Sequence, residues 1–131
     1  MKKKNKQLIN SLWWLSLILG FLIYIFFRPN NLIYNNFISF PIKINIESNS
    51  IFTNFFIYSF PNGLWSFSYS QLIFHIYKDY GVKVILLSSL MVFLGIIIEI
   101  LQFHGFINGY FDLIDFFTYI SFHIIILYIQ K

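Results

Sequence analysis

The stretch VILLSSLMVFLGIIIEILQF, residues 84–103, decides the fold class of this chain. It is apolar and long enough to cross a hydrocarbon core of about 30 Å, which takes roughly 20 residues of α-helix. It nevertheless ends on Glu99 and Gln102, and two further acids, Asp112 and Asp115, open the next apolar stretch. A carboxylate beside hydrocarbon is costly unless it is paired, protonated or functional. The sequence therefore predicts a membrane helix with a candidate site at one end.

The composition indicates a membrane protein throughout. Of the 131 residues, 58% are hydrophobic and 11% are charged, whereas about a quarter of a soluble domain is charged. We therefore expect residues 1–131 to form a single integral membrane domain in contact with the lipid bilayer. The formal charge of +4 gathers at the ends of apolar runs, which argues against a nucleic-acid surface. The chain has no cysteine, so thiol chemistry and disulfides are excluded.

Four apolar segments predict an all-α fold, a four-helix transmembrane bundle with a broken or kinked second span. The predicted spans are residues 8–27, 64–77, 84–103 and 112–130. The first ends just before Pro29, which disfavours helical geometry in the residue that precedes it. Because no small-residue cleavage site follows, we expect an uncleaved membrane helix rather than a signal peptide.

The second span is the least regular. Pro61-Asn62-Gly63 divides the apolar stretch 51–77, and proline with glycine is expected to stop a helix. We expect residues 51–60 to lie in the membrane interface and a short span to cover 64–77. One kinked helix across 51–77 is the alternative. Before it, the alternation at 42–47 is typical of a short strand or an interfacial flap.

Lysines set the predicted orientation. Four spans place both chain ends on one side, together with most of the lysines, whereas Arg28 and Lys43 fall on the other side. By the positive-inside rule, the N- and C-termini are predicted to be cytoplasmic in the cell (inner) membrane.

Polar residues from four segments then converge at the outer end. They are Arg28, Asn62, Trp65, Glu99, Gln102, Asp112 and Asp115. A helix face with small residues points Glu99 and Gln102 into the bundle, because such residues allow close packing. That face consists of Ser88, Val92, Gly95, Glu99 and Gln102. The second span has a comparable polar stripe, consisting of Ser59, Asn62, Ser66 and Ser70.

Three carboxyl groups opposite one arginine favour a shared proton or a bound cation, because like charges repel at low dielectric. We expect Glu99 and Asp115 to share a proton. Gln102 would orient a ligand, and Asn62 and Trp65 would form a wall of the pocket.

Simpler interpretations stay open for each group. Asp112 can cap a helix with Asp115 in its first turn, and Arg28 can be an interfacial anchor. Both polar stripes can be packing seams. The three histidines are too dispersed for one metal site, and we expect His123 to make a core hydrogen bond. No metal or cofactor is predicted.

The motif Glu99-Ile100-Leu101-Gln102, followed by Gly109-Tyr110-Phe111-Asp112-Leu113-Ile114-Asp115, resembles the VanZ-like family of small multi-helix bacterial membrane proteins. That family has Glu-x-x-Gln at one helix end and an Asp at the start of the next helix. The resemblance covers mainly residues 84–125, and Tyr119 stands where the family has Asn. It implies an association with the cell envelope or with antibiotic tolerance, since the namesake is linked to glycopeptide resistance.

The predicted function is a VanZ-like integral membrane protein whose outer pocket binds or modifies a cell-envelope component. An envelope lipid or a peptidoglycan precursor is the expected partner, and catalysis is left open. The alternative is a non-catalytic subunit of a membrane complex, which binds a proton or a cation or serves assembly. A holin-like pore explains the intramembrane carboxylates least well.

Overall fold

The computed structural model describes residues 3–27, 44, 50–78, 80–108 and 111–131, and these contain helices and no strand. The all-α prediction is thus confirmed for the described part of the chain. The elements are α1 (Lys3–Ser11), α2 (Trp13–Phe27), α3 (Ile51–Asn54), the π-helical turn η2 (Phe55–Ser59), α4 (Phe60–Tyr77), α5 (Val82–Ser88), α6 (Leu90–Phe103) and α7 (Leu113–Gln130). Arg28 and most of the predicted flap at 42–47 lie outside the described residues.

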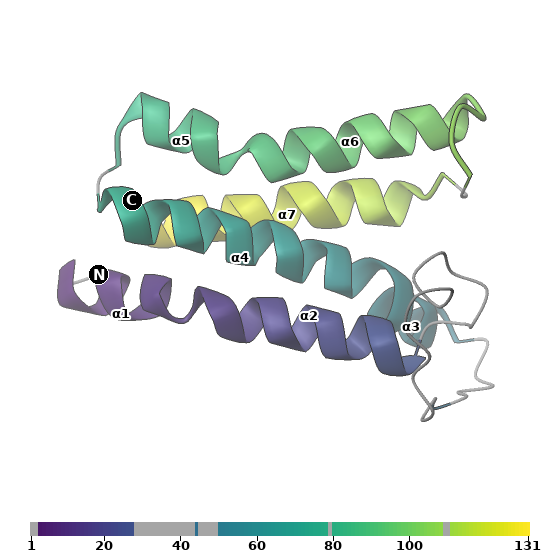
Figure 1. The fold of residues 1–131 in the computed structure, drawn as a ribbon, viewed down its shortest axis with the longest axis horizontal. Coiled ribbons are helices and arrows are strands. Elements are labelled where there is room, and N and C mark those ends of the chain that lie inside the picture. Colours follow the sequence, from purple (N-terminus) through teal and green to yellow (C-terminus); the bar gives the residue numbers. More distant parts are fainter. Residues whose placement is uncertain (1–2, 28–43, 45–49, 79, 109–110) are drawn as a thin grey trace.

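The elements form four antiparallel rods: α1 with α2, α3 to α4, α5 with α6, and α7 (Figure 1). Both ends of the chain lie at one end of the bundle (Figure 1). The first and third rods are interrupted by one residue each, Leu12 and Ser89. Beside these breaks, Ser11 Oγ donates to Leu8 O at 2.7 Å, and Ser89 Oγ donates to Leu86 O at 2.8 Å. Such hydroxyl bonds compete with the helical ladder and bend helices.

The second rod corrects the prediction made from its proline. It is helical from Ile51 to Tyr77, and Pro61 lies in the first turn of α4 instead of ending a helix. The π-helical turn η2 precedes it, with the Phe60 N–H bonded to Phe55 O. A wider turn accommodates the proline ring and its missing N–H. The expectation of a helix stop at Pro61 is therefore wrong, and the structure contains the single irregular helix that was the alternative.

Among the described residues, three helical stretches are long and apolar enough to cross a membrane: Asn5–Phe27, Val82–Phe103 and Leu113–Gln130. They coincide closely with three of the predicted spans. The second rod is not among them, because α4 is less apolar than α2, α6 and α7. α4 instead lies at the centre and contacts elements of all the other rods (Figure 1). Its polar residues are therefore shielded by apolar helices.

The predicted packing faces are buried except for Gln102, which is half-buried. On the third rod, Ser88, Val92, Gly95 and Glu99 are buried, and on the second rod Ser59, Asn62, Ser66 and Ser70 are buried. Small residues bring the helices close together. A Cβ added at Gly95 would lie 2.7 Å from Cε2 of Tyr119 in α7. The outward faces of the apolar helices remain exposed, as for Phe93 and Ile124.

Candidate functional site

Glu99 is a buried carboxylate near the end of α6. Its side chain is 4% exposed, and its Oε2 accepts a hydrogen bond from the backbone N–H of Asp112 at 3.0 Å. Asp112 precedes α7 and caps it, because its Oδ1 accepts from the N–H of Ile114 at 2.7 Å. The third and fourth rods thus meet at their acidic ends. The capping interpretation of Asp112 is confirmed alongside this contact.

Asp115 completes a group of three carboxyl groups at this end. It lies in the first turn of α7, where an acid suits the helix dipole, and its Oδ1 is buried. Asp112 and Asp115 are both close enough to Glu99 for their charges to act on it. Gln102 lies almost one turn beyond Glu99 on α6 and is half-buried. The structure therefore brings together the acids that the sequence singled out.

Asn62 and Trp65 do not form the expected wall. Asn62 is buried, and its Nδ2 donates to Tyr58 O at 3.3 Å within the second rod. Trp65 packs against α2 instead, with its ring centroid 5.4 Å from that of Tyr24 and its indole over Gly20. Because α4 is surrounded by helices, the side of α4 that carries Trp65 packs against α2 rather than against α6 and α7.

A cavity of about 380 Å³ opens beside the acids, between the start of the second rod and the start of α7. Its lining residues are Asn54, Phe55, Tyr58, Ser59, Asp112 and Ile114. Most of them were not predicted from the sequence, because residues 51–60 were expected to lie in the membrane interface. Asp112 was among the predicted site residues, and on the second rod Ser59, the first member of the polar stripe, also pointed to this place.

The lining of this cavity indicates which chemical groups fit it. Its lining residues combine an acid, Asp112, with the polar residues Asn54, Tyr58 and Ser59 and with the apolar residues Phe55 and Ile114. Its described lining includes no basic side chain. A carboxylate favours a ligand that donates hydrogen bonds or carries positive charge. Within the described residues, no group of three His, Cys, Asp or Glu is placed to hold a metal ion.

His123 makes the core hydrogen bond that the sequence predicted. Its Nδ1 lies 2.9 Å from Ser70 Oγ, and both residues are buried. Ser70 Oγ also donates to Ser88 O at 3.1 Å, so the contact joins α4, α5 and α7. Because serine has a single hydroxyl proton, the histidine donates from Nδ1. His104 is exposed and packs edge-on against Phe103, so it does not join the acids.

The fold and the site together indicate the class of protein to which this chain belongs. The described residues form an all-helical bundle with three helices able to cross a membrane. One end of this bundle has an acidic cavity. Compared with family models, curated proteins and solved structures, the chain gives no match.

Proposed function

We propose that this chain is a multi-pass protein of the cell (inner) membrane whose acidic end cavity binds a cell-envelope component. The cavity lined by Asp112, next to the buried Glu99, is the observation that carries this proposal. The ligand is a head group that presents amines, amides or hydroxyl groups, as part of an envelope lipid or a peptidoglycan precursor. The ring of Phe55 and the side chain of Ile114 suit its apolar portion.

The orientation is part of the proposal. α4 acts as the fourth span, because it runs the length of the bundle inside three apolar rods (Figure 1). Exposed Lys78, Lys83 and Lys131 lie at the end that carries both termini. By the positive-inside rule, that end is cytoplasmic and the acidic cavity faces outward.

The VanZ-like motif supports the same site. Its Glu-x-x-Gln corresponds to Glu99 and Gln102, and its Asp corresponds to Asp115. We propose that Glu99 and Asp115 share a proton, since neighbouring carboxyl groups at low dielectric repel one another when both are ionised. Gln102 orients the ligand. The associated cellular role is tolerance to drugs that act on the envelope.

Two substitutions of Glu99 test the proposal. Glu99→Gln keeps the shape and can still accept the hydrogen bond from Asp112, but it removes the ionisable group. In a deletion strain that carries the variant at wild-type membrane abundance, we expect lost tolerance to cell-wall and lipid II-directed drugs. Ser121→Ala, at an exposed position of α7, is the matched control and leaves tolerance intact. Unchanged susceptibility in both Glu99→Gln and an equally abundant Glu99→Leu contradicts the proposal.

The bond between Glu99 Oε2 and the Asp112 N–H favours a second candidate. In this alternative the chain is a non-catalytic subunit of a membrane complex, which binds a proton or a cation or serves assembly, and Glu99 holds α6 to α7. Glu99→Leu then lowers the melting temperature and the membrane abundance, and tolerance follows abundance. Glu99→Gln retains both, because its amide oxygen can still accept the bond.

A further inference from the structure

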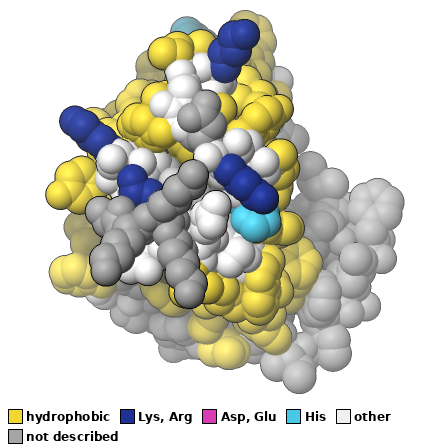
Figure 2. Space-filling view, turned by 90° about the vertical axis from the view of Figure 1, so that its left-hand side faces the viewer, with side chains coloured by type: hydrophobic (Ala, Val, Ile, Leu, Met, Phe, Trp, Pro, Cys, Tyr) yellow, Lys and Arg dark blue, Asp and Glu magenta, His cyan; other side chains and the backbone are white. Residues whose placement is uncertain are grey.

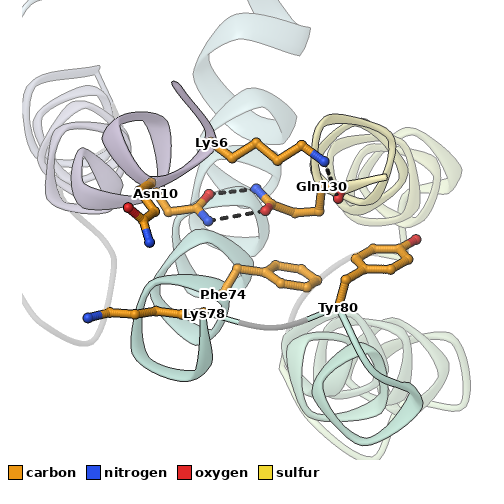
Figure 3. Close-up of a pocket in the computed structure, with 7 residues that line it drawn as sticks. Lys6, Asn10, Phe74, Lys78, Tyr80 and Gln130 are labelled. Atoms are coloured by element: carbon orange, nitrogen blue, oxygen red, sulfur yellow. Dashed lines mark hydrogen bonds between the residues drawn. The ribbon is translucent and has the colours of Figure 1, made fainter. Parts of the chain in front are cut away.

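The opposite end of the bundle contains a second pocket, which has no part in the acidic site. Its volume is about 160 Å³, and it lies among α1, α4 and α7 (Figure 3). Its lining residues are Lys6, Gln7, Asn10, Phe74, Lys78, Tyr80 and Gln130. Basic, amide and aromatic residues therefore line one pocket, with the ammonium groups of Lys6 and Lys78 on opposite sides of it (Figure 3).

One wall of this pocket is a reciprocal amide pair between the first and the last rods. Asn10 Nδ2 donates to Gln130 Oε1 at 3.2 Å, and Gln130 Nε2 donates to Asn10 Oδ1 at 2.6 Å (Figure 3). The two residues are 3% and 9% exposed. A second wall is aromatic, because the rings of Phe74 and Tyr80 stack with centroids 5.9 Å apart. Both walls are held in place by interactions within the bundle.

Lys6 extends across the amide pair. Its Nζ donates to Gln130 O at 2.6 Å (Figure 3). That carbonyl belongs to the last turn of α7, where the helix dipole is negative and attracts a cation. An ammonium group has three donors, and this bond uses one of them. The contact therefore fixes the position of a cation that can still donate to a ligand.

This end of the bundle is positively charged. Lys78, Lys83 and Lys131 are exposed there. In the end-on view, basic side chains are spread over the face, and no carboxylate is visible in the part drawn in colour (Figure 2). The acids that the structure describes, Glu99, Asp112 and Asp115, belong to the other end, and Asp79 lies outside the described residues. An anion at this pocket thus meets a positive field.

An apolar groove lies at the same end of the bundle, where α4 ends and α5 begins. It has a volume of about 560 Å³, and its lining residues are Tyr77, Gly81, Val82, Lys83, Val84 and Leu87. Lys78 and Tyr80, from the same turn, line the basic pocket. The surface that suits a polar head group and the surface that suits a hydrocarbon chain are therefore only a few residues apart along the chain.

We propose that the basic pocket binds the phosphate head group of an anionic phospholipid from the leaflet at that end, with an acyl chain along the adjoining groove. Basic pockets between transmembrane helices on the cytoplasmic side are a recognised mode of binding such head groups. Lys6 and Lys78 supply the positive charge, and the backbone carbonyl of Gln130 holds Lys6 over the pocket. This site is independent of the acidic cavity proposed above.

The test is thermal unfolding of the purified full-length protein in detergent. Phosphatidylglycerol is added in one arm, phosphatidylcholine in another and glycerol phosphate in a third. Phosphatidylglycerol alone is expected to raise the melting temperature of the wild type substantially. Lys6→Gln with Lys78→Gln should abolish that rise, with about fivefold weaker binding for each lysine removed. Lys131→Gln is the control, because Lys131 lies at the same end and lines neither surface.

Two results overturn the proposal directly: an undiminished phosphatidylglycerol shift in the double variant, or an equal shift with phosphatidylcholine. An equal shift with glycerol phosphate overturns the lipid assignment and indicates a soluble phosphate. Since Lys6→Gln also removes the bond to Gln130 O, Lys78→Gln is measured alone. That variant leaves the bond in place, and it must still reduce the phosphatidylglycerol shift.

Discussion

At the scale of single residues, glycines allow close helix contacts in this bundle, because aromatic rings occupy the space of their missing side chains. Gly95 faces the ring of Tyr119, and Gly63 faces Phe122 and Thr118, all from α7. A Cβ at either glycine would lie within 3.0 Å of these groups. Ring positions of this kind leave little room for adjustment in a packed interior.

Gly95→Ala is therefore expected to destabilise the protein. Overpacking a close contact typically costs about 1–3 kcal/mol, and the ring of Tyr119 is itself buried. Thermal unfolding in detergent should show a lower melting temperature for Gly95→Ala than for the wild type. Ser121→Ala, on the exposed side of α7, should match the wild type. A Gly95→Ala protein with wild-type stability would mean that α6 and α7 are further apart than described.

Ser70 offers a second residue-level prediction. Its hydroxyl links His123 of α7 to the Ser88 carbonyl of the third rod. Ser70→Ala leaves both groups buried without this partner, and interhelical bonds of this type contribute roughly 0.6–1.7 kcal/mol. We expect a lower melting temperature, again compared with Ser121→Ala. If Ser70→Ala unfolds like the wild type, the hydrogen bond does not contribute to stability.

Residue positions on the third rod were predictable, whereas those on α4 were not. Val92, Gly95 and Glu99 share one face because of their spacing. The opposite face is apolar, so helical periodicity indicates that these three residues point into the bundle. α4 has helices around it, and periodicity then cannot say which neighbour a given side chain meets. For this reason Trp65 was expected near the acids and instead lies against Gly20.

At the scale of elements, length and hydropathy predicted the apolar helices well. The stretch 84–103 corresponds to Val82–Phe103, and 112–130 corresponds to Leu113–Gln130. The second rod was harder, because the effect of a proline depends on the local turn. The π-helical turn before Pro61 depends on backbone geometry that the residue types alone do not specify. Most of the cavity lining on the second rod was missed because residues 51–60 were expected to lie in the membrane interface.

At the scale of the whole molecule, the proposed topology can be measured directly. The chain has no cysteine, so single cysteines can be introduced at exposed positions without background labelling. Asn5→Cys and Lys131→Cys lie at one end, and Asn108→Cys lies in the turn at the other end. In intact cells, a membrane-impermeant maleimide should label Asn108→Cys and should reach the other two only after permeabilisation. Labelling of all three from one side would contradict the topology.

The amide pair of Asn10 and Gln130 sets an order of events during biosynthesis. Its partners are 120 positions apart in the chain, so the contact cannot form until the ribosome has delivered the chain as far as Gln130. Until then the side-chain amide of Asn10 must form its hydrogen bonds with water, with lipid or with the insertion machinery. The contact between the first and the fourth rods at this end consequently forms only after all four rods have been synthesised.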